Sequence, residues 1–320
     1  MQPTPYTPAD LAVLVAGHDE MQAFEKKRGL DGKRVVFEGL KLRPKQSTAI
    51  SRPLLSCGIF SVSQDINDLT YTHATPLKIE RIDPDIGFFR VRYTGRALGQ
   101  PAKRVLGYLI QRNAALILVR SAKGKGAGEV GDALGLNVRE ACRDIGWKGS
   151  ATRDAAKFRD CLRQLKSANL ELFALGSTLM TGFVAEISCI GEFDSAGVVT
   201  VNLHTAMANF FEAGATYLQV CHLAKLRDGL ATWLHGYIRA HRTSKRFNIP
   251  ELHAASGSTA KPKLFGTMVR DAMGKLEKAG VVLAFSASRG VLNVVLPMSV
   301  KEEAAAAEKA AAQAAETGAE

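Results

Sequence analysis

Residues 144–165 read DIGWKGSATRDAAKFRDCLRQL, in which a short glycine-containing turn separates two stretches with helical character. The stretch before the turn, NVREACRDIG, is short and amphipathic. After it, apolar residues recur at the spacing of one helical face, at Ala155, Phe158, Leu162 and Leu165. Three segments rich in β-branched residues follow, LELFAL, VAEISCIGEF and VVTVNL, and they are typical of strands. Helix, turn, helix and hairpin is the order of a winged-helix domain.

The same order of patterns returns after residue 220. HLAKLRDGLATWLHGYIRAHR predicts a long helix, and NIPELHAASG predicts a short one with Asn248 as N-cap and Pro250 in its first turn. After the turn GSTAKP, a second long helix carries one apolar face, formed by Phe265, Val269, Ala272, Leu276 and Ala279. Two strands are then expected around Ser288-Arg289-Gly290. We therefore predict an α+β chain with two tandem winged-helix domains.

The rest of the chain predicts the boundaries of these domains. Residues 9–26 form an amphipathic pattern, and the basic, proline-containing 41–53 is typical of a linker. CGIFSVS and FFRVRYTG predict strands, PAKRVLGYLIQRNAALILV a helix leading into an apolar strand, and KGKGAGEVGDALG a loop. We expect an arm and linker at 1–50, domains at 51–203 and 204–297, and a low-complexity Ala/Glu-rich tail at 298–320.

The charge of the chain favours a polyanionic partner. Lysine and arginine number 42 against 31 acids, a net charge of +11. The last twenty residues hold two lysines and five glutamates, or −3, so residues 1–300 carry +14. Such an excess favours nucleic acid or an acidic membrane surface as partner, without indicating the fold.

Cysteine usage and hydropathy indicate a cytoplasmic protein. The five cysteines are odd in number, widely spaced and without a CxxC pair, which argues against a disulfide framework or a zinc knuckle. LAVLVAG near the N-terminus follows an acid and lacks the basic residues of a signal peptide. The longest wholly apolar run, Ala114–Val119, is far below the roughly 20 residues that span a bilayer.

The outward faces of the two long helices carry the candidate DNA contacts. Cationic and amide side chains reach base edges and phosphates in a major groove, and base contacts concentrate near the N-terminus of a recognition helix. In the first copy the expected contacts are Lys148, Ser150, Thr152, Arg153, Lys157, Arg163 and Gln164. In the second they are Lys261, Lys263, Thr267, Arg270 and Lys278, with Arg289 at the hairpin tip. One such face alone is better explained as a solvated helix face, but its recurrence on a basic chain favours DNA binding. Trp147 and Cys142 are assigned to core packing.

The motifs of common enzymes are incomplete. Gly126-x-Gly128-x-x-Gly131 matches a dinucleotide fingerprint, but Gly135 interrupts the helix that such a site needs, and Lys125 is not followed by the Ser or Thr of a phosphate loop. The seven histidines form no HExxH and no pairing with cysteines, and Cys221-His222 would meet His235 only by accident of the fold. We therefore expect a binding protein without catalytic residues, cofactor or metal.

Several short motifs resemble the TrfA-type plasmid replication initiators, of the Rep class with two winged-helix domains. The resemblance runs from about residue 53 to 285. It is carried by Arg92-Tyr93-Thr94-Gly95 with Leu98; 144–147 with Leu162 and Leu165; the helix ending at 237–241; Leu252 with 256–258; and Val269, Ala272, Leu276 and 280–282. It implies binding to repeated origin sequences (iterons), melting of neighbouring AT-rich DNA, recruitment of host replication proteins, and monomers and dimers that differ in activity.

One further motif and two other classes of DNA-binding protein are compatible with the sequence. Asn169-Leu170-Glu171-Leu172-Phe173 is similar to the peptide that docks on bacterial sliding clamps, but it has Asn for the leading Gln and falls where a core strand is expected. The partners implied are origin duplex DNA, a host initiator, the replicative helicase, this clamp and a second copy of the chain, with no membrane. A winged-helix transcriptional repressor and a nucleoid or partition protein are the alternatives.

Overall fold

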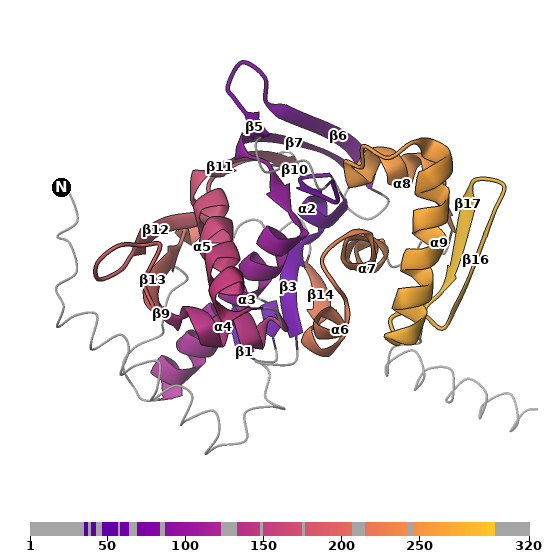
Figure 1. Ribbon diagram of the computed structural model, residues 1–320. Coiled ribbons are helices and arrows are strands. Elements are labelled where there is room, and N and C mark those ends of the chain that lie inside the picture. The colour runs from indigo at the N-terminus through magenta and orange to yellow at the C-terminus, as the bar shows by residue number, and fades with distance from the viewer. Residues whose placement is uncertain are drawn as a thin grey trace, which may run out of the picture.

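The computed structural model describes residues 35–37, 40–42, 47–56, 58–63, 69–83, 87–122, 133–147, 150–174, 177–206, 215–241 and 246–297 (Figure 1). Within these residues the chain is a mixed α+β protein with several small sheets. The helix expected at 9–26, the glycine motif at 126–131 and the tail beyond 298 lie outside the described residues.

A first unit ends at Lys225 and is built around one apolar core. Its helices are α2 (Arg52–Ser56), α3 (Gln100–Ala122), α4 (Val138–Asp144), α5 (Ala151–Ser167) and α6 (Val220–Lys225). Its longest strands form one sheet, with β10 (Asn169–Ala174) between β7 (Gly87–Arg96) and β11 (Ser177–Thr181), while β5 (Thr70–Tyr71) and β6 (Leu77–Asp83) also pair with β7. A second sheet has the order β12 (Val184–Ser188), β13 (Val198–Leu203), β9 (Leu134–Asn137). The paired strands β1 (Val35–Phe37) and β2 (Leu40–Leu42), β3 (Ser47–Ser51) and β14 (Ala215–Gln219), and β4 (Phe60–Ser61) and β8 (Leu98–Gly99) complete it.

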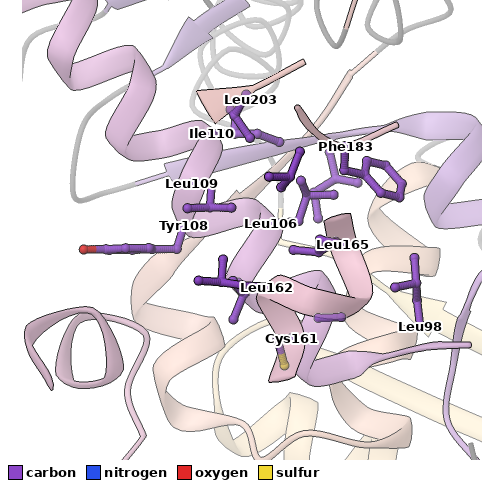
Figure 2. Close-up of a cluster of buried hydrophobic side chains, with 14 of the residues drawn as sticks. Leu98, Leu106, Tyr108, Leu109, Ile110, Cys161, Leu162, Leu165, Phe183 and Leu203 are labelled. Atoms are coloured by element: carbon purple, nitrogen blue, oxygen red, sulfur yellow. The ribbon is translucent and has the colours of Figure 1, made fainter. Parts of the chain in front are cut away.

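The core of the first unit lies between α3 and α5. Leu162 and Leu165 of α5 are fully buried, and Figure 2 shows them gathered with Leu106 of α3 and with Phe183 and Leu203. Ala155 and Phe158 are buried on the same side of α5, which confirms the predicted apolar face. Burial of these side chains supplies the main favourable free energy that holds α5 in place.

A second unit begins at Leu226 and has its own apolar core. Its elements are α7 (Leu230–Ala240), β15 (Arg246–Asn248), α8 (Ile249–Ser256), α9 (Pro262–Lys278), β16 (Ala284–Ser288) and β17 (Val291–Val295). The strands form an antiparallel sheet in the order β15-β17-β16. In Figure 1, α9 lies between α7 and the β16–β17 hairpin at one end of the molecule. Every element predicted for the second copy after its first helix is present.

Two predictions about single elements were wrong. The expected linker at 41–53 contains β3, which pairs with β14, and Thr48 of β3 donates a hydrogen bond to the Gly107 carbonyl of α3 at 2.6 Å. The apolar run Ala114–Val119 is not a strand but continues α3, because no Gly or Pro lies between Gly107 and Gly124 to end the helix. Of the elements after residue 204, β14 and α6 pack on the first core, which also includes Ala240 of α7, while the second core begins at Leu226.

Two further differences concern the order of elements. The long helix expected at 222–242 is two helices, α6 and α7, separated by a turn at 226–229. The segment LELFAL is not part of the hairpin after α5 but the strand β10, paired with β7 on one edge and β11 on the other. The hairpin itself is formed by β12 and β13, as VAEIS and VVTVNL predicted.

Candidate nucleic-acid interface

The turn before α5 is fixed by backbone contacts. Asn137 caps α4 by accepting hydrogen bonds from the backbone N–H groups of Arg139 and Glu140. After α4, the Trp147 N–H donates to the Cys142 carbonyl at 3.0 Å, and Gly146 adopts φ +80°. A Cβ atom at Gly146 would lie 3.1 Å from the Cα of Ala224 in α6, so this position needs glycine for both its backbone angle and its space.

The N-terminal end of α5 is open to solvent. Ser150, the N-cap residue, and Thr152 and Arg153 in the first turn are exposed. None of the three side chains has an ion pair or hydrogen bond within the part of the chain that the structure describes. Lys148, predicted as a phosphate contact, lies outside the described residues. The open end is where a recognition helix makes its base contacts.

The remaining candidates on α5 are engaged within the protein. Gln164 was predicted to point outward, but it is only 6% exposed and donates to Asp160 at 2.9 Å. Asp160 also forms an ion pair at 2.8 Å with Arg96, at the end of β7. This contact holds the end of β7 against α5 and shields the Gln164 side chain from solvent. Lys157 binds Asp228 at 2.8 Å.

Arg163 is paired with the hairpin of the first unit. It forms an ion pair with Asp194, in the loop between β12 and β13, and its guanidinium lies 4.9 Å from the centre of the Phe193 ring. The side chain is 42% exposed, so this pair is screened by solvent and adds little to stability. In the described protein, Arg163 therefore faces its own hairpin.

The second unit presents a cationic helix face without such pairing. The apolar face of α9 is buried as predicted, with Phe265, Val269 and Leu276 fully inaccessible. The opposite side exposes the candidate residues Lys261, Lys263, Thr267, Arg270 and Lys278. Among the described residues, none of these side chains takes part in an ion pair or hydrogen bond. Their charges are therefore available to an external anion.

The β16–β17 hairpin ends in a cationic two-residue turn. Ser288 pairs with Val291, so Arg289 and Gly290 alone form the loop, and both have positive φ, 48° and 78°. This is the pattern of a type I′ turn, which suits the twist of the strands but disfavours a side chain at its first position. Arg289 nevertheless occupies this position, and its side chain is exposed.

The junction of the two units holds charged residues that the sequence analysis missed. Arg104 of α3 is 4% exposed and forms an ion pair between its Nε and Asp228 Oδ1 at 3.0 Å. Its Nη1 donates to the carbonyls of Ile145 at 3.0 Å and Leu223 at 2.9 Å, and its Nη2 donates to Leu226 at 2.7 Å. One guanidinium thus joins the end of α4, the end of α6 and the turn before α7. No sequence pattern marks it, since these partners lie far apart in the chain.

Two buried basic groups lie beside this junction. Lys103 is 2% exposed and donates to the Thr232 carbonyl of α7 at 2.8 Å. Burial, with Arg104 nearby, lowers the pKa of Lys103 to about 7, although Asp228 opposes the shift. Burial and the charge of Lys103 also hold the pKa of His235 well below its ordinary value. His222 does approach His235, with ring centres 5.9 Å apart, but the described residues contain no group of three metal-binding side chains.

Lys103→Met is expected to weaken the pH dependence of stability. The folded pKa of Lys103 is about 7, while the unfolded chain keeps 10.5, so between these values the unfolded state binds the extra proton. Stability of the wild type therefore rises with pH in this range, by up to about 1.4 kcal/mol per pH unit, and below pH 7 the cost of burying the charge is fully present. Urea unfolding from about pH 6 to about pH 9 should show the variant's advantage shrinking as the pH rises. The exposed Lys225→Met is the control, and parallel profiles for Lys103→Met and wild type would contradict this account.

The segment similar to a clamp-binding peptide is a central strand. Asn169–Phe173 lies in β10, which is hydrogen-bonded along both edges, and Leu170 and Leu172 are at most 3% exposed. A docking peptide must offer its apolar side chains and its backbone to the partner. In the folded protein this segment offers neither its backbone nor its two leucines, and Phe173 is half-buried with the Arg90 guanidinium over its ring. No helix among the described residues is both long and apolar enough to span a bilayer.

The chain was compared with known proteins. No protein-family model matches it, and no curated protein matches its sequence. Two crystal structures of RctB are similar in fold. One, of domains 2 and 3 in selenomethionine form, has a TM-score of 0.49 and 9% sequence identity, over 78% of this chain and 100% of that one. The other, RctB-155-483, has a TM-score of 0.44 and 11% identity, over 72% of this chain and 96% of that one.

Proposed function

We propose that the protein binds double-stranded DNA sequence-specifically and initiates plasmid replication at repeated origin sequences. In this proposal α3, β9, α4, α5, β12 and β13 form one winged-helix domain, and α7, β15, α8, α9, β16 and β17 form the other. The observation that carries it is the exposed face of α9, where four cations and Thr267 have no ion pair or hydrogen bond to any described residue. The cationic hairpin tip at Arg289 and the charge of +14 over residues 1–300 support it.

The mechanism is one of positioning, without covalent chemistry. The two recognition helices, α5 and α9, read successive major-groove faces of one repeat, and arrays of bound protein strain the neighbouring AT-rich DNA. The initiator role and the recruitment of a host initiator and helicase rest on the resemblance of the sequence motifs to the TrfA-type initiators. A monomer–dimer equilibrium belongs to the same proposal. A clamp contact through residues 169–173 does not, because β10 is paired on both edges.

The test begins with selection of random duplexes by the full chain, followed by titration across salt concentration. We expect enrichment of one motif of about two helical turns, bound about 10³-fold more tightly than bulk DNA. A steep salt dependence without enrichment would instead indicate a nucleoid-type binder, held by phosphate contacts alone.

A second measurement separates an initiator from the alternative, a winged-helix transcriptional repressor, which uses the same groove contacts. Permanganate should modify thymines in AT-rich DNA beside an array of the selected sites when the initiator is bound. A repressor that binds the same sites should leave those thymines unreactive. An unreactive array would therefore favour the repressor.

Arg270→Ala and Arg289→Gly are expected to weaken DNA binding in different ways. Arg270 lies on the exposed face of α9, so its loss should cost about 1–3 kcal/mol on the selected site and relax one base position. Arg289 lies at the hairpin tip, so its loss should weaken all sequences alike and reduce the salt slope by about one. Glycine suits the positive φ of this turn, so Arg289→Gly should keep the melting temperature of the wild type. Wild-type binding by both variants would contradict the assigned interface.

A further inference from the structure

The strongest feature that the proposed function leaves unused is a link between α5 and the start of the second unit. Lys157 of α5 extends its ammonium to Asp228 Oδ2, 2.8 Å away, in the turn that leads into α7. The same ammonium lies 4.3 Å from the centre of the Trp147 ring, in the turn before α5. These two contacts determine where the cation points, because a cation over an indole face is attracted to its ring electrons. Lys157 therefore faces the second unit, and it differs from the equally exposed Arg163 in that its partner Asp228 is mostly buried, 15% exposed against 76% for Asp194.

Asp228 is a fixed partner and not a mobile surface acid. Its Oδ1 pairs with Arg104 at 3.0 Å, and its side chain is 15% exposed. Arg104 is itself held by three backbone carbonyls, two of which, Leu223 and Leu226, flank the start of the turn that carries Asp228. The carboxylate thus accepts from α3 with one oxygen and from α5 with the other. Lys157 connects the first recognition helix to a rigid anchor.

Asp228 is connected to the second recognition helix, α9, through α7. Asp228 lies two residues before α7, and α7 packs against α9 across the second core. A displacement of Lys157 relative to Asp228 therefore changes the position of α5 relative to α7 and α9. Two helices that read one duplex must match its repeat, since each base pair moves the second half-site along and around the DNA.

We infer that Lys157 is a positioning residue whose bond to Asp228 sets the number of base pairs between the two halves of the binding site. This inference rests on the proposed function, because it requires that α5 and α9 read one duplex together. It assigns to Lys157 a contribution to specificity that needs no contact with DNA. The expected DNA contacts on α5 then reduce to its exposed N-terminal turn, with Arg153 as the base-reading side chain.

The test is the dependence of binding on spacing. The selected two-part site is rebuilt with one or two base pairs inserted or removed between its halves, and binding is measured by fluorescence anisotropy for the full chain. For the wild type we expect the preferred spacing to be favoured by about tenfold over its neighbours. For Lys157→Met, which keeps an apolar stem against Trp147 but loses the charge, we expect the preference to fall to about threefold or less. The affinity for an isolated half-site should stay unchanged.

Two further variants make the result specific. Arg163→Met is the matched control, because Arg163 is a half-exposed cation of the same helix that pairs with Asp194 of its own unit. It should keep the spacing preference. Asp228→Asn removes the other partner and should relax the preference as Lys157→Met does, while its amide oxygen still accepts a bond from Arg104. Melting temperatures verify that each variant is folded, and Lys157→Met is informative alone if Asp228→Asn unfolds.

The outcomes that overturn the inference are distinct from failure of the proposed function. If Lys157→Met weakens binding equally at every spacing, Lys157 contacts phosphate and does not set the spacing. If its spacing profile equals that of the wild type, the bond to Asp228 has no part in specificity. Either result leaves the proposed function standing. If the wild type itself selects no two-part site, the proposed function fails and the inference fails with it.

Discussion

Phe265→Ala is expected to lower the free energy of unfolding of the second unit by about 3–5 kcal/mol. Phe265 lies in the first turn of α9, is 0% exposed, and packs its ring against His253 of α8 with centres 4.5 Å apart. Alanine removes the ring and leaves a cavity where α8 and α9 meet, beneath the helix that carries the candidate DNA contacts. Loss of this packing therefore destabilises the helix that we propose reads DNA.

The chain has a convenient reporter for this measurement. Of its two tryptophans, Trp233 belongs to the second core and Trp147 packs against the first. In a Trp147→Phe background, urea unfolding followed by tryptophan fluorescence reports on the second unit alone. The neighbouring Leu264→Ala is the matched control, because Leu264 is 56% exposed and should change stability by less than about 0.5 kcal/mol. Equal midpoints for the two variants would show that Phe265 does not support the core.

The second unit shows how much of a fold local sequence patterns can predict. The helix expected from KLFGTMVRDAMGKLEKAG is α9, Pro262–Lys278, with the predicted side buried, and the turn at Ser288-Arg289-Gly290 joins the predicted strands. Asn248 and Pro250 mark the start of α8 as expected. These features depend on helical period, capping and turn chemistry, which act over a few residues and are therefore readable from sequence.

The first unit contains features that local sequence patterns do not predict. Gln164 was expected on the outward face of α5, and helical period alone does place it there, but the side chain is buried beside Asp160 and Arg96. Arg96, at the end of β7, is 64 residues away from Asp160 in the chain, so the burial of Gln164 cannot be predicted from local sequence. The break between α6 and α7 was missed for the same reason. The turn residue Asp228 is held by Arg104 and Lys157, from two helices of the other unit.

Arg104→Met is expected to lower the free energy of unfolding by about 3–5 kcal/mol, more than any other substitution of a charged residue proposed above. The substitution removes the donor of three buried carbonyls, each of which is then left without that bond in a site closed to water. It also leaves Asp228 with Lys157 as its remaining cation. Because burial already lowers the pKa of Arg104 against the opposing effect of Asp228, the charge is tolerated only through these partners.

A lysine at position 104 tests whether stability depends on the positive charge of Arg104 or on its planar guanidinium with several donors. Arg104→Lys keeps a cation beside Asp228 but cannot place donors on three carbonyls and a carboxylate at once, so we expect an intermediate loss of stability. Arg143→Met is the control, since Arg143 is 75% exposed and its one ion pair among the described residues is with Glu140 of its own helix. Urea unfolding of the three variants should therefore rank Arg143→Met nearest the wild type and Arg104→Met furthest. If Arg104→Met unfolded with the wild type, the junction would not depend on its guanidinium, and the anchor for Lys157 would have to be Asp228 alone.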